Sequence, residues 1–407
     1  MHVAVVVQNS ELVVDIRPRA EAEALAAAGL TVTLVGPTDD PDRLREITSA
    51  DVGLAVFPRP REASGVGGQL LEQSRLFARS VAALRALARK RQLDVIHAGN
   101  PPDDAWLFPR LVAGVRSSRP HFVFDQHDVA PVLLTEKYGS RPAMAGLARA
   151  ASGFEARSFS HASLVIFANS EYAGRARDLR LLRSPWEVVP NGWSLPEDYP
   201  HHDWRRGAAH LLAYVGAISE QDGVDHLVDA VAQLRERDNV RVVVAGEGDA
   251  RERAERLARA LGVGERFEWL GLVRDRGLLA SLVRSADVCV APEADSEFNR
   301  LASFIKIGEY LSAARPVVAH RLPQSEALVG GGIEFADDMS AKSLADAIQR
   351  LLADPDRATR LGLTGRRQFE EQLSWRNVGA VRLVSSYRRV FEGAGDTGLH
   401  GVPADTR

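Results

Sequence analysis

Short apolar runs alternate with amphipathic stretches along most of the chain. The strand-like runs fall at residues 2–8, 30–36, 94–99, 121–128, 162–170, 186–192, 211–217, 240–248, 266–271, 286–292 and 315–320. Helical periodicity is clearest at residues 19–29, 223–236, 250–261 and 303–314. Continuous apolar runs separated by helices are typical of buried parallel strands. The pattern therefore predicts an α/β fold with doubly wound, Rossmann-like sheets.

The alternation is interrupted between residues 194 and 210. This segment is polar, contains two prolines and has no clear period, which favours an interdomain linker. The sequence thus predicts an N-terminal domain over residues 1–193 and a C-terminal domain over 211–378. A helix over 379–393 is expected to pack back on the first domain, before a disordered tail over 394–407. Two such domains would face each other across a central cleft.

Composition places the chain among ordinary globular proteins. It is 45% hydrophobic and 26% charged, with a net charge of −3, which gives no general attraction to nucleic acid. The single cysteine, Cys289, excludes an internal disulfide, as expected in a reducing cytosol. No apolar run approaches the roughly 20 residues of a membrane span. The basic amphipathic stretch 75–92 predicts a surface helix or, alternatively, a peripheral contact with the inner membrane face.

Lysine is rare in this chain. Only four of the 51 basic residues are lysines, a bias typical of GC-rich bacterial genomes. One of them, Lys306, lies between two isoleucines and three residues before Glu309. The helix should begin near Ser303, which places both side chains on about the same face and Lys306 in the anion-binding first turn. The alternatives are a lysine that extends to solvent and a simple surface ion pair.

The second half carries an ordered series of motifs. They are "VPNGW" (189–193), "YVGAISEQDGVDHLVDAV" (214–231), "VVVAGEGD" (242–249), "FEWLGLV" (267–273), "ADVCVAPE" (286–293), "KIGEYLSAARPVVAH" (306–320), "GGGIEF" (330–335) and "LSW" (373–375). In this order they resemble the donor-binding half of GT-B glycosyltransferases of the retaining family 4 type. The first half adds "IHAGNPPD" (96–103) and "FDQHDVAP" (124–131), which resemble a subgroup of that family.

The resemblance implies a GT-B fold and a sugar-transfer reaction. The donor would be a nucleotide diphosphate sugar, with UDP or GDP as the expected carrier, and no metal is expected. The acceptor would be a hydroxyl or thiol of a small molecule or lipid-linked glycan, in natural-product or exopolysaccharide biosynthesis. Transfer would proceed by front-face substitution with retention, in a cytoplasmic monomer or homodimer. The adjacent His201 and His202 have poor spacing for metal ligands.

The resemblance also implies roles for residues of the second half. Lys306, and Arg300 before it, would bind the phosphates, while Glu309 would hold the ribose. The family's usual first glutamate is replaced by Leu301, so Glu297 or Asn299 is expected to meet the sugar hydroxyls. The remaining expected donor contacts are Gly216, Ala217, Gly246, Gly271, Leu272, Val273 and Ser303.

One departure from the family concerns the loop 216–223. The family usually carries cations there, whereas "GAISEQDG" has none and holds Glu220 and Asp222. Either Lys306 and Arg300 take over the cationic role, or the diphosphate site is weakened or lost. A sugar-nucleotide epimerase and a non-catalytic nucleotide-sugar-binding partner subunit are therefore the rival functions.

Polar residues in the first half follow the predicted strands. His127, at the end of one strand, would contact the donor sugar or the acceptor, unless it is a structural histidine. The expected acceptor contacts are Asn100, Asp103 and Asp128. Near the N-terminus, Asp15 and Arg17 would either fix the first loop or touch the acceptor.

Overall fold

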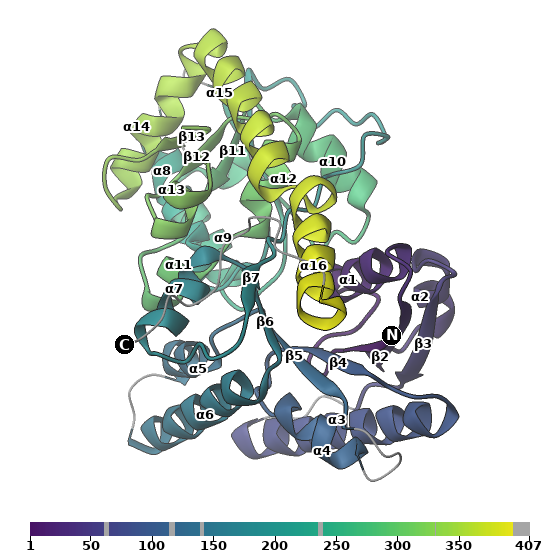
Figure 1. The fold of residues 1–407 in the computed structure, drawn as a ribbon. Coiled ribbons are helices and arrows are strands. Elements are labelled where there is room, and N and C mark those ends of the chain that lie inside the picture. Colours follow the sequence, from purple (N-terminus) through teal and green to yellow (C-terminus); the bar gives the residue numbers. More distant parts are fainter. Residues whose placement is uncertain (61–64, 114–118, 139–141, 235–238, 330, 394–407) are drawn as a thin grey trace, which may run out of the picture. The chain divides into compact units, whose positions relative to one another are not determined.

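The computed structural model describes residues 1–60, 65–113, 119–138, 142–234, 239–329 and 331–393. The chain forms two compact units, each built around its own parallel sheet (Figure 1). The first unit comprises Met1–Val189 and the segment from Gly379 onward, and the second comprises Pro190–Val378. The tail 394–407, for which we predicted disorder, lies outside the described residues.

The described residues of the first unit form seven parallel strands. They are β1 (His2–Val6), β2 (Thr31–Pro37), β3 (Val52–Phe57), β4 (Val95–Gly99), β5 (His121–Gln126), β6 (Leu164–Phe167) and β7 (Trp186–Val188). The helices are α1 (Ile16–Ala27), α2 (Pro41–Ile47), α3 (Gly65–Lys90), α4 (Phe108–Val112), α5 (Ala130–Tyr138), α6 (Pro142–His161), α7 (Ser170–Asp178) and α16 (Ala380–Tyr387), with a 3-10 turn at Ala105–Leu107. The strand order is β3-β2-β1-β4-β5-β6-β7. The winding therefore reverses between β1 and β4, where open α/β sheets bind their ligands.

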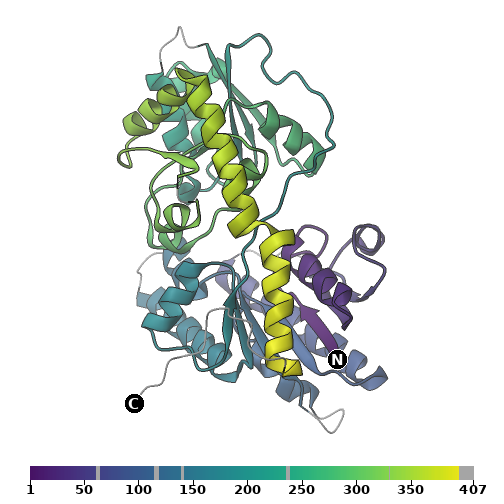
Figure 2. The ribbon, with the colours of Figure 1, turned by 45° about the horizontal axis from the view of Figure 1, so that its top comes forward.

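The helix α16 comes from the far end of the sequence. It packs against α1 and β7 of the first unit, and Figures 1 and 2 show it in yellow beside the purple α1. Wider helical turns at Trp375–Gly379 and Arg388–Glu392 flank it. Tyr387 at its end is fully buried, so the first unit is completed by residues that follow the whole second unit.

In the described part of the second unit, six strands form a parallel sheet. They are β8 (His210–Val215), β9 (Val240–Ala245), β10 (Phe267–Gly271), β11 (Val288–Ala291), β12 (Val317–Ala319) and β13 (Ile333–Phe335). The helices are α8 (Val224–Gln233), α9 (Arg251–Ala260), α10 (Arg276–Ser285), α11 (Glu297–Leu301), α12 (Ile305–Ser312), α13 (Pro323–Val329), α14 (Ala341–Leu352) and α15 (Pro355–Gln368), with 3-10 turns at Glu220–Asp222 and Gly264–Arg266 and a wider turn at Phe369–Leu373. The strand order is β10-β9-β8-β11-β12-β13, which places the reversal between β8 and β11.

The central strand β8 shows why these strands are apolar over most of their length. Leu212 and Tyr214 face the cluster that includes α8, α9 and α14, whereas Leu211 and Ala213 face the cluster that includes α10 and α12. Successive side chains point to opposite faces of a sheet, and helices cover both faces here. Side chains on both faces of the sheet are therefore buried, and adjacent positions along a strand are both hydrophobic. This produces the continuous apolar runs of the sequence.

These sheets confirm the predicted α/β, doubly wound architecture. The sequence pattern missed two edge strands, β3, whose burial is only partial, and the three-residue β13. The segment 194–210, predicted as a linker, packs on the second unit through Leu195 and Trp204, both buried. None of the described helices combines the length and the apolar character that a membrane span requires.

Candidate functional site

The carboxyl ends of β4 and β5 bring several predicted residues of the first unit together. Gly99 ends β4, and His127 and Asp128 follow β5. The side-chain oxygen of Asn100 accepts hydrogen bonds from the backbone N–H groups of His127 at 2.7 Å and Asp128 at 3.2 Å. The Asn100 amide donates to Asp103 at 2.8 Å. Asn100 is itself buried, so it holds the His127–Asp128 turn in place rather than facing solvent.

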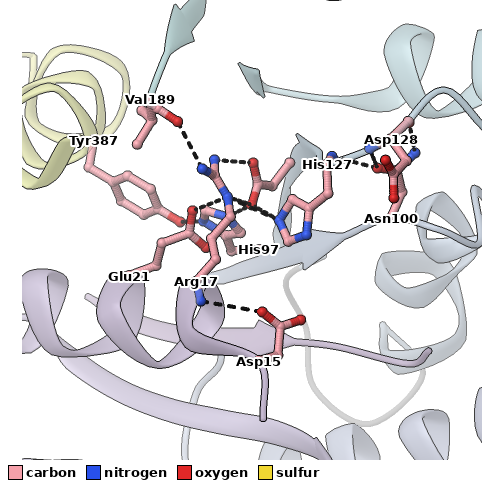
Figure 3. A network of polar contacts seen from close by, with 10 residues as sticks. Asp15, Arg17, Glu21, His97, Asn100, His127, Asp128, Val189 and Tyr387 are labelled. Atoms are coloured by element: carbon pink, nitrogen blue, oxygen red, sulfur yellow. Dashed lines mark hydrogen bonds and ion pairs between the residues drawn. The ribbon is translucent and has the colours of Figure 1, made fainter. Parts of the chain in front are cut away.

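Arg17 lies at the centre of a buried network (Figure 3). Asp15 caps α1 by accepting a hydrogen bond from the Arg17 backbone. The Arg17 guanidinium forms a bidentate contact with Asp125, at 2.7 and 3.0 Å, and donates to the Val189 carbonyl at 2.8 Å. Only 3% of Arg17 is exposed. The guanidinium thus supports neighbouring groups within the protein, in agreement with the first of the two predicted roles, and its acceptor contact stays a prediction.

Charge is balanced within this network. Burial opposes ionisation of Asp125, but the Arg17 charge, helped by hydrogen bonding with His127, holds its pKa well below the usual range. Burial and the nearby Asp125 raise the pKa of Glu21 well above its usual range. Burial lowers the pKa of His97, which leaves that imidazole neutral. One ionised carboxylate therefore faces one guanidinium, as a buried charge requires.

Glu21, Asp125 and His127 also resemble a metal-ligand set, since their ligand atoms lie within 4.8 Å of one another. The Nε atom of Arg17 lies 3.0 Å from Glu21, 3.0 Å from Asp125 and 3.1 Å from His127. A permanently charged guanidinium thus occupies the position that a metal ion would take. We assign this cluster to Arg17 and not to a metal.

Two carboxyl groups predicted to contact the acceptor lie beside this network. Burial raises the pKa of Asp103 to about 7 and that of Asp128 to about 6. Asp128 also hydrogen-bonds with Tyr172, which follows β6 in α7. Shifts of this kind are common at functional sites, because burial near a ligand surface favours the neutral acid.

In the second unit, Lys306 lies between the carboxyl ends of β8 and β11. It belongs to the first turn of α12, and only 8% of it is exposed. Its ammonium lies 2.7 Å from the Glu293 carboxylate, 3.5 Å from Asp222 and 2.9 Å from the hydroxyl of Tyr214. Burial opposes the charge, but Glu293 raises the pKa of Lys306 above its ordinary value. The lysine is thus charged, buried and already paired.

Glu309 lies on the same helix and is also buried. Arg276, at the start of α10, donates to Glu309 at 3.0 Å and to the Ser194 carbonyl at 3.3 Å. Burial raises the pKa of Glu309, and the Arg276 charge opposes that shift. The arginine therefore holds one oxygen of the carboxylate that we expect to bind ribose.

The glycines of the predicted donor loop allow very close packing. A side chain at Gly246 would lie 1.8 Å from the Gly216 carbonyl oxygen, and one at Gly216 would lie 2.8 Å from the Cε atom of Lys306. Gly216 and Gly271 have positive φ angles of 152° and 74°, which favour glycine. Ala217 and Leu272 are exposed next to these turns, and Val273 is half-buried.

The remaining predicted donor residues are not brought together with Lys306. Arg300 is exposed and forms a bidentate ion pair with Asp295, at 2.6 and 2.7 Å. Asn299 is buried, and its amide donates to the backbone oxygens of Gln221 and Ala294, both at 2.7 Å. Glu297 is exposed at the start of α11, and Ser303 precedes α12, which begins at Ile305. Their donor contacts stay predictions.

Sequence reasoning missed several residues of both networks. The missed groups are Glu21, His97, Tyr172, Tyr387, Tyr214, Arg276 and Glu293. Glu293 offered one signal, since an acidic residue directly after an apolar strand is expected at the ligand edge of a parallel sheet. The tyrosines offered none, because each lies in an ordinary amphipathic or apolar run.

Two doubly wound units, each with polar side chains at its topological switch point, define the GT-B class of fold. Residues 16–192 match the family described as glycosyl transferase 4-like domain, and residues 209–354 match the family described as glycosyl transferases group 1. The two matches together cover most of the chain and identify it as a glycosyltransferase. Among curated proteins, none matches the chain significantly.

Solved structures share the fold over nearly the whole chain. A sucrose-phosphate synthase from Thermosynechococcus elongatus is 22% identical, with a TM-score of 0.75 over 97% of this chain and 100% of its own. HepE of Anabaena, solved in complex with UDP, is 17% identical, with a TM-score of 0.65 over 97% and 100%. WaaG, a glycosyltransferase involved in lipopolysaccharide biosynthesis, is 15% identical, with a TM-score of 0.64 over 96% and 99%.

Proposed function

We propose that this glycosyltransferase moves a sugar, with retention, from a nucleotide diphosphate sugar to a hydroxyl or thiol of a small-molecule or lipid-linked acceptor. The observation that carries the proposal is that Lys306 and Glu309 are both buried and lie three residues apart on α12, with Lys306 next to the Gly216 turn. The ammonium would stabilise the charge that develops on the leaving diphosphate. Glu309, oriented by Arg276, would accept hydrogen bonds from vicinal ribose hydroxyls.

The nucleotide is proposed to be UDP or GDP. HepE was solved with UDP and with UDP-glucose, which supports a uridine donor for a chain of the same fold. In this chain the expected base-binding segment, residues 271–273, would offer backbone groups. Because Lys306 is already paired with Glu293 and Asp222, the diphosphate must exchange with these carboxylates on binding.

A thermal-shift panel of UDP-, GDP-, ADP- and TDP-sugars tests the nucleotide assignment. A ligand at a hundredfold excess over its Kd stabilises the folded state by about 2.7 kcal/mol. The sugar nucleotide that the site binds should therefore raise the unfolding temperature, and the others should not. Lys306→Ala and Glu309→Ala should abolish that shift. Lys342→Ala is the matched control, because Lys342 is an exposed lysine of the same unit and its loss should change nothing.

Transfer itself is tested with the matching donor and a panel of acceptors. Release of nucleoside diphosphate that depends on acceptor, with an α-linked donor giving an α-linked product, supports a retaining transferase. Conversion of the donor sugar without acceptor would instead indicate an epimerase. Nucleotide binding without any turnover would indicate a non-catalytic partner subunit. Full activity in both Lys306→Ala and Glu309→Ala would contradict the donor site.

A further inference from the structure

Arg276 connects three segments of the second unit through one guanidinium group. Its Nη1 atom donates to Glu309 Oε1 of α12 at 3.0 Å, and its Nη2 atom donates to the Ser194 carbonyl oxygen at 3.3 Å. Ser194 belongs to the segment before β8, and the backbone N–H of the next residue, Leu195, donates to Ser312 at the end of α12 at 3.2 Å. The guanidinium is therefore held between the main chain and the Glu309 carboxylate.

The backbone of Arg276 is fixed as well. Asp275 caps α10 by accepting hydrogen bonds from the backbone N–H groups of Gly277 at 2.8 Å and Leu278 at 3.1 Å. A capped first turn has a defined backbone conformation, and Arg276 is the first residue of this helix. It closely follows the segment 271–273, which we expect to bind the base. Arg276 thus extends from the expected base-binding segment to the carboxylate expected to bind ribose.

The two carboxylate oxygens of Glu309 have different surroundings. Oε1 accepts the hydrogen bond from Arg276, whereas no described residue of the chain donates to Oε2. Only 9% of the Glu309 side chain is exposed, and a buried carboxylate needs a paired cation to stay ionised. Burial raises its pKa, and the charge of Arg276 opposes that shift. Arg276 thus favours the ionised form, which accepts hydrogen bonds at both oxygens and leaves Oε2 available to a ligand.

The Arg276 guanidinium also has a donor left for a ligand. A guanidinium carries N–H groups on all of its nitrogen atoms, and the contacts with Glu309 and Ser194 use only Nη1 and Nη2. In the part of the chain that the structure describes, Nε donates to no acceptor. The Arg276 side chain is 34% exposed, so it reaches the surface beside the buried carboxylate. The two side chains together present an acceptor oxygen and a donor group side by side.

We propose that Arg276 and Glu309 bind the ribose of the donor nucleotide as a pair and make the site select ribonucleotides against 2′-deoxyribonucleotides. Glu309 Oε2 accepts a hydrogen bond from one hydroxyl group, and the Arg276 guanidinium donates to the oxygen atom of the other. A vicinal diol supplies both partners, because each hydroxyl group can donate and accept. This inference rests on the proposed function for the position of the nucleotide, and it adds Arg276 as a specificity-determining residue.

The loss of one hydroxyl group would leave one member of the pair unsatisfied. With a 2′-deoxyribose in place, either Glu309 Oε2 or the Arg276 guanidinium loses its partner while the nucleotide still shields it from water. A site that hydrogen-bonds a substrate hydroxyl discriminates against the analogue without it, because its own polar groups are left unpaired. A hydrogen bond to a charged group contributes about 1.5–3 kcal/mol. We therefore expect the ribonucleotide to bind at least about tenfold more tightly than its 2′-deoxy form.

Calorimetric titration of the full-length protein with UDP, GDP and their 2′-deoxy forms tests this selectivity. The decisive quantity is the Kd of the 2′-deoxynucleotide divided by the Kd of the ribonucleotide. Arg276→Ala should weaken the ribonucleotide about tenfold and the 2′-deoxynucleotide much less, so the ratio falls toward one. A residue that only supports the fold would weaken both nucleotides equally. An unchanged ratio in Arg276→Ala would therefore overturn the proposal.

Two further variants complete the test. Arg276→Lys keeps the positive charge near Glu309 but lacks the planar fork of N–H groups, so it should retain more affinity than Arg276→Ala and only part of the selectivity. If Arg276→Ala does not fold, Arg276→Lys decides, because a fully native ratio in that variant would contradict the role of the guanidinium. Arg256→Ala is the matched control, since Arg256 is an exposed arginine of α9, and both Kd values should stay native.

The same titrations separate this proposal from the proposed function. If the native protein binds neither UDP nor GDP, the proposed donor site is refuted and the ribose contact falls with it. If the native protein binds a ribonucleotide and its 2′-deoxy form equally, nucleotide binding stands and the ribose contact alone is refuted. Absence of sugar transfer with any acceptor would refute the proposed reaction only, because titration measures the ribose selectivity without turnover.

Discussion

The ion pair between Lys306 and Glu293 leads to a prediction about nucleotide binding. Glu293 lies 2.7 Å from the Lys306 ammonium, and both side chains are buried. If Lys306 binds the diphosphate, the Glu293 carboxylate competes for the same cation. Glu293→Gln removes the negative charge and keeps the shape and a hydrogen-bond acceptor. We expect this variant to bind UDP or GDP more tightly and to be less stable without nucleotide.

Coulomb's law gives the size of both effects. At 2.7 Å and an effective dielectric constant of 20, the pair attracts by about 6 kcal/mol before desolvation is subtracted. Breaking a buried ion pair costs about 3–5 kcal/mol. Lys306 keeps its contact with Asp222 in the variant, so we expect the free energy of unfolding to fall by about 3 kcal/mol, the lower end of that range. A phosphate charge roughly 6 Å from Glu293 is repelled by about 3 kcal/mol under the same assumption. Relief of part of this repulsion should lower Kd by about tenfold.

Calorimetric titration with UDP and GDP measures Kd, and urea denaturation measures the change in stability. Titrations are done at a temperature where both proteins are folded, so that the loss of stability does not mask the binding. Glu252→Gln is the control, because Glu252 is an exposed glutamate of α9. An unchanged or weaker affinity in Glu293→Gln would refute the reasoning. It would mean that Glu293 positions Lys306 for the phosphate instead of competing with it, or that the phosphate binds elsewhere.

Two further predictions concern single residues. Burial raises the pKa of Asp103 from 3.8 to about 7, so its contribution to stability is complete below pH 3.8 and is lost as pH rises through 7. Asp103→Asn should therefore stabilise the protein at pH 8 but not at pH 4, as measured by urea denaturation, and equal effects at both pH values would contradict the shift. Gly246→Ala should displace the Gly216 carbonyl, which lies 1.8 Å from the new Cβ, and should weaken nucleotide binding at least tenfold by titration. Gly174→Ala leaves that affinity unchanged if the clash is the cause.

The sequence predicted the sheets well because burial on both faces leaves a strong local signal. The runs at β1, β4 and β8 are almost entirely buried, with one histidine in each otherwise apolar run, and no partner needs to be known to recognise them. The edge strand β3 lacked that signal, since most of it is only half-buried. Local helix signals were equally clear for α12, whose predicted start lies within two residues of Ile305.

The sequence predicted only some residues of the candidate sites, because the residues that contact one another there lie far apart in the sequence. Lys306 and Glu309 could be proposed from their spacing, but Asp222 is 84 residues from Lys306. His97 and Tyr387 are separated by 290 residues, and no local pattern indicates such a contact. The choice between the two roles predicted for Arg17 was open for the same reason, because Asp125, which binds its guanidinium, is 108 residues away in the sequence.

The discontinuity of the first unit has a consequence for synthesis on the ribosome. Residues 1–189 emerge first, but Tyr387 emerges only after the whole second unit, Pro190–Val378, has been made. The second unit is continuous and can fold while translation proceeds. The first unit cannot be completed until α16 has been made, and until then His97 and Glu21 lack the neighbouring Tyr387. The hydrogen bond from Tyr387 is thus among the last native contacts to form, and a nascent chain released early would present an incomplete first unit to chaperones and proteases.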